Sequence, residues 1–137
     1  NCCFRAGQSI ETEKKFLRAG PRATQYFDSA TVRADIVCSG KNSPGINNII
    51  RELVTLLKGI YKVERVTGIR FSWRGFYTSD TIDLTPELVR AIHHMGGSYL
   101  GLSNAPCNVE EVVDSMEMRG VNQLYLIGGN DTIKNGT

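Results

Sequence analysis

Apolar residues along the chain fall into short continuous runs and into stripes of helical spacing. The run Ala34–Cys38 (ADIVC) is rich in β-branched residues and predicts a buried strand. In Ile46–Leu57, apolar side chains recur at i, i+3, i+4, i+7, i+8 and i+11, which predicts one buried face of an amphipathic helix. Between them lies Ser39–Gly45 (SGKNSPG), a segment of small and polar residues typical of a turn. The stretch therefore predicts a strand, a tight turn and a helix.

Further apolar runs predict the remaining strands. Tyr61–Ile69 and Asn122–Ile127 have the composition of strands, and Ser98–Leu102 predicts a short strand or an extended segment. Helical patterns separate these runs. Strands separated by helices predict an α/β fold with a mainly parallel, doubly wound sheet and right-handed crossovers.

Two further helices are expected after the second strand. Thr85 caps the first of them, which ends at Gly96–Gly97. Asn108 caps the second, with Glu111 placed for a capping box, and that helix ends at Arg119–Gly120. The side chains expected on their buried faces are Leu88, Val89, Ile92 and Met95 in the first helix, and Val109, Val112, Val113 and Met116 in the second.

Three turns are expected at the carboxyl edge of the sheet: Ser39–Gly45, Arg70–Tyr77 within the loop Arg70–Ser79, and Gly128–Thr132. The first is either a tight turn feeding a core helix or an anion site at a helix start. The loop is either packed by its own rings or forms a ligand wall in which Trp73 or Tyr77 stacks on a flat group. Ligands of parallel sheets bind at this edge, so the convergence favours a phosphate or nucleotide site.

Composition narrows the choice of partners. The chain has 137 residues, 41% of them hydrophobic, which is enough for one domain or a piece of one. Its net charge of +2 without any Lys/Arg run argues against nucleic acid, and no apolar run is long enough to cross a membrane. Residues 1–31 are expected to form an extended arm whose Tyr26 and Phe27 pack on the body, which comprises residues 32–137.

The cysteines and histidines suggest no metal site. Cys2, Cys3, Cys38 and Cys107 have neither zinc-finger spacing nor the density of a disulfide scaffold. Cys38 lies in the expected buried strand, where a reduced, inert thiol is typical. A reducing, cytoplasmic setting is therefore expected. His93–His94 fall near a helix end, without a second ligand at useful spacing.

Several motifs, in order along the chain, resemble the N-terminal part of plant-type ATP-dependent 6-phosphofructokinases. The matching pieces are FLRAGPR, QYFDS, VRADIV, PGINNIIRE, VTGI, RGFY, LTPELV, IHHMGGSYLGLS and EEVVDSMEMRGVNQLYLIGGN. The resemblance implies an α/β doubly wound domain pair. It implies transfer of the γ-phosphoryl group of MgATP to fructose 6-phosphate, so nucleotide, Mg²⁺ and sugar phosphate are the expected ligands, and a homo-oligomer is one expected assembly.

The resemblance also implies roles for individual positions, several of which depart from the family pattern. The glycine pair of the first phosphate turn stands here as Gly40 and Lys41. Trp73 occupies the place of an aromatic residue beside the nucleotide. The family's Arg-Gly, whose arginine contacts phosphate, is replaced by Asn104 and Ala105, so a cation that would stabilise the transferring charge is lost.

The last turn departs as well. The family sequence Gly-Gly-Asp-Gly-Thr appears here as Gly128, Gly129, Asn130, Asp131 and Thr132. Asn130 stands at the position of the acid that serves Mg²⁺. Asp131 matches pyrophosphate-dependent relatives, in which an aspartate repels the ATP α-phosphate. The alternative is that Asp131 supplies the Mg²⁺ carboxylate one place late.

In the family, the general base and the sugar-phosphate ligands follow this turn, so no catalytic residue is assigned within the 137 residues and the isolated chain is expected to be inactive. Two hypotheses remain open. One is a fragment of a 6-phosphofructokinase that gives fructose 1,6-bisphosphate in glycolysis. The other is a degenerate, non-catalytic relative or a pyrophosphate-dependent one.

Overall fold

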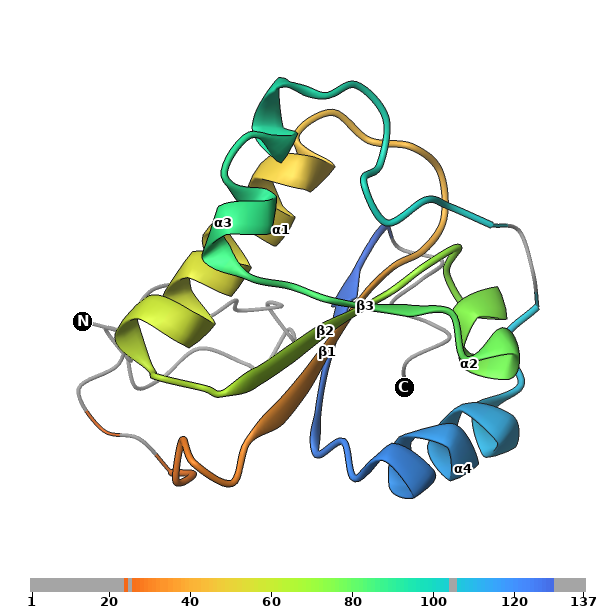
Figure 1. The fold of residues 1–137 in the computed structure, drawn as a ribbon. Coiled ribbons are helices and arrows are strands. Elements are labelled where there is room, and N and C mark those ends of the chain that lie inside the picture. The colour runs from red at the N-terminus through yellow and green to blue at the C-terminus, as the bar shows by residue number, and fades with distance from the viewer. Residues whose placement is uncertain (1–23, 25, 104–105, 130–137) are drawn as a thin grey trace, which may run out of the picture.

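The chain folds around a four-stranded sheet in the order β3-β2-β1-β4 (Figure 1). The computed structural model describes residues 24, 26–103 and 106–129. Strands β1 (Arg33–Cys38), β2 (Arg65–Ile69) and β4 (Gln123–Ile127) are parallel, and β3 (Thr81–Asp83) pairs antiparallel with β2. The sheet is therefore mainly parallel, as expected.

Helices cover both faces of this sheet. Helices α1 (Ile46–Thr55) and α3 (Pro86–Val89) pack together on one face, and α2 (Arg74–Thr78) and α4 (Val109–Arg119) pack together on the other (Figure 1). Each parallel strand connects to the next through a helical segment. The predicted doubly wound α/β architecture is thus confirmed.

The central strand β1 divides the core into two clusters, because successive side chains of a strand point to opposite faces. Ala34, Ile36 and Cys38 pack on the side of α1. Val37 points the other way. It packs against residues from β2, α2 and α4, namely Ile69, Trp73, Phe76 and Val112. Strand β1 lies between β2 and β4, so it contributes to both clusters from the middle of the sheet.

The first helix follows its predicted apolar stripe with one exception. Ile46, Ile50 and Val54 are buried, whereas Ile49 is 53% exposed. The α-helix ends at Thr55 and continues as a short π-helical segment, η1 (Leu56–Ile60), in which the Tyr61 N–H donates to the Leu56 carbonyl at 3.1 Å. This added turn delays β2, which begins at Arg65 rather than at the predicted Tyr61.

The middle of the chain differs most from expectation. The predicted loop Arg70–Ser79 contains helix α2, and β3 follows it without a counterpart in the hydrophobic pattern. Thr85 caps α3 as predicted, since its Oγ1 accepts from the Leu88 N–H at 3.2 Å. The helix predicted to reach Gly96 stops at Val89, however, and resumes only as the 3₁₀ turn η2 (Ile92–His94).

Two further expectations were wrong in detail. Ser98–Leu102 forms no strand; it turns at Gly101, whose φ is 75° and whose N–H donates to the Ser98 carbonyl at 3.0 Å. In α4, Asn108 is the N-cap, but its side-chain amide donates to Glu111 Oε1 at 2.7 Å instead of accepting from a backbone N–H.

The buried face of α4 is also narrower than predicted. Val112 is buried, whereas Val109 and Val113 are 57% and 45% exposed. The helix instead turns the small, polar Ser115 inward. The apolar stripe was therefore assigned to too wide an arc of this helix.

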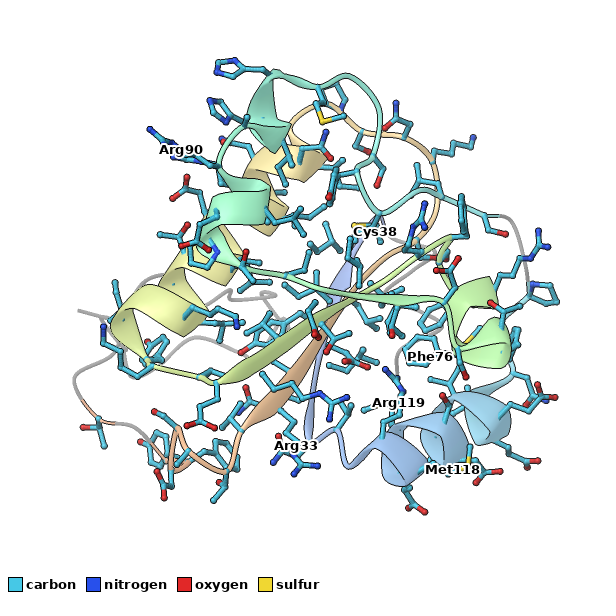
Figure 2. All side chains as sticks on the ribbon, in the orientation of Figure 1. Arg33, Cys38, Phe76, Arg90, Met118 and Arg119 are labelled. Carbon is cyan, nitrogen blue, oxygen red and sulfur yellow. The ribbon has the colours of Figure 1, made fainter. Side chains whose placement is uncertain are left out.

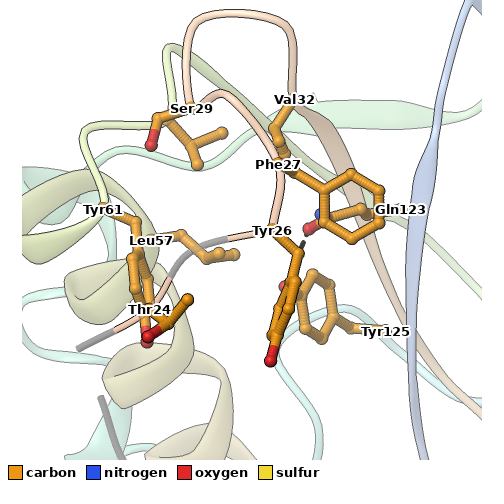
Figure 3. A pocket seen from close by; sticks show the side chains of 10 residues that line it. Thr24, Tyr26, Phe27, Ser29, Val32, Leu57, Tyr61, Gln123 and Tyr125 are labelled. Carbon is orange, nitrogen blue, oxygen red and sulfur yellow. Dashed lines mark hydrogen bonds between the residues drawn. The ribbon is translucent and has the colours of Figure 1, made fainter. Parts of the chain in front are cut away.

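The N-terminal arm is described only for residues 24 and 26–31, which contain neither helix nor strand. Tyr26 and Phe27 are 83% and 69% exposed, so the prediction that they pack on the body was wrong. Together with Tyr61 and Tyr125 they line a cavity of about 250 Å³ beside β4 (Figure 3). This cavity lies towards the amino ends of the strands, away from the predicted phosphate turns.

Candidate phosphate site at the carboxyl edge

Three predicted turns meet at the carboxyl edge, because β1, β2 and β4 run in the same direction. Their register places Cys38 beside Ile127 and Val37 beside Ile69, so the three strands end together. The Ser39 N–H donates to the Ile127 carbonyl at 2.9 Å, which joins the first turn to the end of β4. Chain segments 39–45, 70–73 and 128–129 therefore share one edge of the sheet.

The first turn offers open backbone at the start of α1. Gly40 and Gly45 have φ of 87° and 84°, a left-handed conformation that favours glycine. Gly45 is the N-cap of α1, and no side chain caps that end. No atom lies within 4 Å of a Cβ built on Gly45. A ligand can thus approach this helix start closely, at its positive dipole end.

Lys41 lies exposed in this turn, and its φ is not positive. The backbone conformation therefore does not require glycine at position 41. The lysine changes the turn through its side chain alone, which adds bulk and one positive charge where the resemblance implies close approach of phosphate.

The third turn is described as far as Gly129, where an added Cβ would also meet no atom within 4 Å. Asn130, Asp131 and Thr132 lie outside the described residues. Asn104 and Ala105 lie outside them as well, but the structure describes the segment before them, up to residue 103. The Phe71 N–H donates to the Leu100 carbonyl at 2.8 Å, which sets this segment beside the loop after β2.

Trp73 does not have the position that the nucleotide-stacking hypothesis requires. Its side chain is only 3% exposed and packs in the core, with its ring centroid 6.1 Å from that of Phe76. Burial leaves no ring face free for a ligand, so for Trp73 the alternative of a loop packed by its own rings is correct. Tyr77 is also engaged: its hydroxyl donates to the Pro106 carbonyl and accepts from the Asn108 N–H.

Phe71, which the sequence analysis did not single out, is an exposed aromatic residue at this edge. It is 42% exposed, has a φ of 57°, and lies under the Arg70 guanidinium at 5.1 Å. A signal was present, since Phe71 stands only two residues after the last residue of β2. The stacking hypothesis named Trp73 and Tyr77 instead, because the segment contains several aromatic residues.

Asn47 is a second residue that the hydrophobic pattern did not indicate. It is 4% exposed, and its side chain links α1 to the segment after η2. Outside this link is a cavity of about 360 Å³, lined by residues from the first turn, the start of α1 and the η2 region: Asn42, Ser43, Pro44, Gly45, Asn47, Asn48, His93, Met95, Gly96 and Gly97.

The titratable groups near the edge are few. Burial raises the pKa of the Cys38 thiol to about 11, although the nearby Ser98 hydroxyl opposes this rise, so the buried free thiol expected here is confirmed. His93 and His94 are exposed with ring centroids 3.8 Å apart. In the described part of the chain, no three His, Cys, Asp or Glu side chains gather into a metal site.

A buried ion pair lies away from this edge, between β1 and α4. Asp35 is 1% exposed and pairs with Arg119 Nη2 at 2.6 Å. Arg119 also lies over the Phe76 ring at 5.4 Å (Figure 2). Burial raises the pKa of Asp35, and the positive charge of Arg119 offsets only part of that rise.

Among residues 24, 26–103 and 106–129, none of the helices has both the length and the apolar character needed to cross a bilayer.

The comparisons with known proteins agree on one family. A family model described as phosphofructokinase matches residues 33–136. ATP-dependent 6-phosphofructokinase 4, chloroplastic, of Arabidopsis thaliana is 45% identical over 119 residues, which are 87% of this chain and 22% of that protein. The ATP-dependent 6-phosphofructokinase of Amycolatopsis methanolica is 41% identical over 124 residues, 89% of this chain and 27% of that protein. The chain therefore spans about a quarter of the length of these curated relatives.

Solved structures show the same fold. A pyrophosphate-dependent phosphofructokinase from Marinobacter aquaeolei superposes with a TM-score of 0.68 at 17% identity, over 76% of this chain and 28% of that one. Pichia pastoris phosphofructokinase in the T-state gives a TM-score of 0.67 at 22% identity, over 88% of this chain and 14% of that one.

Proposed function

Because the chain belongs to the phosphofructokinase family, we propose that it forms the phosphoryl-donor half of a 6-phosphofructokinase. In the whole protein, the γ-phosphoryl group of ATP would pass to fructose 6-phosphate to give fructose 1,6-bisphosphate. The observation that carries the proposal is the meeting of the three turns at one edge, joined by the Ser39 N–H to Ile127 carbonyl hydrogen bond.

The chemistry of this edge suits a polyphosphate. The start of α1 carries the positive end of a helix dipole, and open backbone at Gly45 and Gly129 lets phosphate oxygens approach. Phosphoryl transfer depends mainly on positioning and on neutralising charge, and a rigid parallel sheet holds such groups in place. We propose that Gly40, Lys41 and Gly129 contact the donor phosphates, and that Asn104, Ala105, Asp131 and Thr132 complete that set.

We propose Asn130 as the residue that would bind Mg²⁺. The described residues do not themselves form a metal site, and Asn130 lies outside them, so support comes from its position after β4. When bound, Mg²⁺ would neutralise charge on the donor phosphates. An amide oxygen is a ligand that hard cations accept, though it carries no charge to balance the ion.

A second candidate function is a phosphate-binding relative with little or no activity on ATP. Asp131 favours it, because it matches the aspartate of pyrophosphate-dependent relatives, which repels the ATP α-phosphate and leaves the smaller pyrophosphate as the better ligand. The replacement of the phosphate arginine by Asn104 points the same way. Sugar-phosphate binding and homo-oligomer formation belong to the whole protein and stay predictions.

The cytoplasmic location also stays a prediction. The buried, reduced Cys38 is compatible with a reducing compartment. Two of the relatives, however, are named as chloroplastic proteins of Arabidopsis thaliana, so a plastid is the alternative location.

Ligand-dependent melting tests the donor site. Ligands that bind the native state raise the melting temperature, so we expect a small shift of this chain with magnesium pyrophosphate and a smaller one with MgATP. The triple variant Lys41→Gly/Asn104→Arg/Asp131→Gly should gain a clear MgATP shift. A coupled assay for fructose 1,6-bisphosphate should detect no turnover by the isolated chain.

The control for this experiment is Lys62→Gly, which removes one exposed lysine away from the carboxyl edge and relieves a φ of 58°. It should change the melting temperature equally with and without ligand. If the triple variant shows no larger MgATP shift than the unchanged chain, the three turns have been assigned wrongly. Turnover by the isolated chain near the rate of a whole enzyme would contradict the donor-half proposal.

A further inference from the structure

Asn47 uses its whole side-chain amide to hold a distant segment. Its Nδ2 donates to the Met95 carbonyl at 3.0 Å, and its Oδ1 accepts from the Tyr99 N–H at 2.7 Å. The side chain is 4% exposed. Its loss would leave two backbone groups without partners in a partly buried place, where unpaired polar groups are costly.

The position of this link matters for the candidate site. Asn47 comes two residues after Gly45, where the first turn becomes α1. Tyr99 precedes Leu100, whose carbonyl accepts from the Phe71 N–H at 2.8 Å. A continuous path of hydrogen bonds and short backbone steps therefore runs from the first turn through Asn47 to the loop after β2.

The same segment leads in sequence to Asn104 and Ala105, the positions implied in phosphate contact. The Ser98 Oγ is buried beside the Cys38 thiol, and Ser98 lies next to Tyr99 in the chain, which runs on towards Asn104–Ala105. A thiol forms only weak hydrogen bonds, so the two amide bonds of Asn47 are the stronger polar link. Leu100 anchors the segment in the core that it shares with α1, and Asn47 adds the polar link to the start of that helix.

We propose that Asn47 is a positioning residue for the phosphoryl donor. It does not touch the ligand. It holds the 95–103 segment against the first turn, so that groups from both meet the same phosphates without further ordering. A ligand that must first order this segment binds more weakly, because the ordering free energy is subtracted from its binding free energy. This inference rests on the donor site proposed above.

Asn122 provides a matched control on the opposite edge of the sheet. Its Oδ1 accepts from the Arg33 N–H at 2.9 Å, and its Nδ2 donates to the Thr31 carbonyl at 2.8 Å. Asn122 therefore makes the same pair of backbone bonds as Asn47, but at the amino ends of β1 and β4. Replacing either asparagine by alanine removes one bridging amide, and only one of the two bridges lies by the phosphate turns.

The experiment compares Asn47→Ala with Asn122→Ala, each in this chain and in the triple variant Lys41→Gly/Asn104→Arg/Asp131→Gly. Calorimetry gives the Kd for magnesium pyrophosphate and for MgATP. Both alanine variants should lower the melting temperature without ligand. Only Asn47→Ala should also raise Kd, by about tenfold, the size expected when a ligand must order one short segment.

Amide hydrogen exchange supplies an independent readout. Asn47→Ala should speed exchange at residues 98–103 while exchange in β1 stays slow, and Asn122→Ala should leave 98–103 unchanged. If Asn47→Ala does not fold, Asn47→Ser replaces it, because the serine hydroxyl is smaller but still polar.

The two ways to fail are distinct. If neither the unchanged chain nor the triple variant binds magnesium pyrophosphate or MgATP, the donor site is overturned and, with it, the positioning role. Binding that survives Asn47→Ala with the same Kd, or that weakens equally in Asn122→Ala, overturns the positioning role alone. Unchanged exchange at 98–103 in Asn47→Ala would likewise show that this side chain does not hold the segment.

Discussion

Phe71 and Ser72 concentrate backbone strain at the carboxyl end of β2. Their φ values are 57° and 59°, and left-handed conformations cost non-glycine residues about 1 kcal/mol or more each. Ser72 is also fully buried, and its Oγ has no hydrogen-bond partner among the described residues. Two unfavourable features at one residue, beside the candidate phosphate edge, make Ser72 an informative position to change.

Ser72→Gly is expected to stabilise the protein by about 1 kcal/mol, because it removes both the strain and the unpaired hydroxyl, less the entropy that glycine adds to the unfolded chain. Urea unfolding measures the change. Ser72→Ala, which removes only the hydroxyl, should give a smaller gain. A loss of stability in the glycine variant would contradict the strain argument.

Arg119→Ala is expected to destabilise the protein by about 3 kcal/mol near neutral pH, because it leaves the buried Asp35 carboxylate without its cation. The folded pKa of Asp35 already lies above its ordinary value, so the folded state takes up a proton more readily than the unfolded chain. Stability from this group is therefore greatest at low pH and is lost as pH rises through the folded pKa.

Removing Arg119 raises the folded pKa of Asp35 further. The difference in the free energy of unfolding between Arg119→Ala and the unchanged chain should therefore shrink as the pH falls. Unfolding at a series of pH values, from near neutral down towards the ordinary carboxyl pKa of about 4, checks the sign. When Asp35→Asn/Arg119→Ala is compared with Asp35→Asn, the pH dependence of the difference in stability should disappear. If the loss of stability in Arg119→Ala grows towards low pH, Asp35 is not the group responsible for the pH dependence.

Among the elements, those with clear local patterns were predictable. Strand β1, helix α1, β4 and the Thr85 cap follow from apolar spacing and capping chemistry. Strand β3 has only three residues, and α2 has five, so neither is long enough for its apolar pattern to repeat. The meeting of the three turns followed from parallel topology. The hydrogen bonds of Asn47 could not be predicted from the sequence, because the adjacent Asn48 has the same side chain and is exposed.

Helix α2 depends on close approach of backbone at Gly75. A Cβ there would lie 2.2 Å from the Arg70 carbonyl oxygen, so Gly75→Ala should displace α2 and cost about 2 kcal/mol or more. Gly59→Ala is the matched control in η1, where an added Cβ meets no atom within 4 Å. Thermal unfolding should show a large loss for the first and little change for the second. Equal losses would contradict the packing argument.

At the scale of the whole molecule, the side of the sheet beside β4 is the least covered. All five residues of β4 are half-buried, and in the described part of the chain β4 pairs only with β1. The aromatic residues Tyr26 and Phe27 rim the cavity next to it. Exposed apolar surface and an unpaired strand edge both favour association.

The isolated chain should therefore bind an apolar fluorescent dye and scatter light increasingly with concentration. Tyr26→Ser/Phe27→Ser should reduce both signals, because these side chains are 83% and 69% exposed at the cavity. Met118→Ser removes a side chain that is 84% exposed on α4, on the other face, and should reduce them less. An equal reduction by Met118→Ser would mean that association does not depend on the cavity.

The buried thiol at the end of β1 also makes the candidate edge observable. Cys38 lies one residue before the first turn, and its raised pKa of about 11 keeps it protonated and unreactive in the folded state (Figure 2). An alkylating reagent reaches it only when the sheet opens beside the turn. The rate at which Cys38 becomes labelled, followed by peptide mass, thus reports how often this edge opens, without adding a probe to the chain.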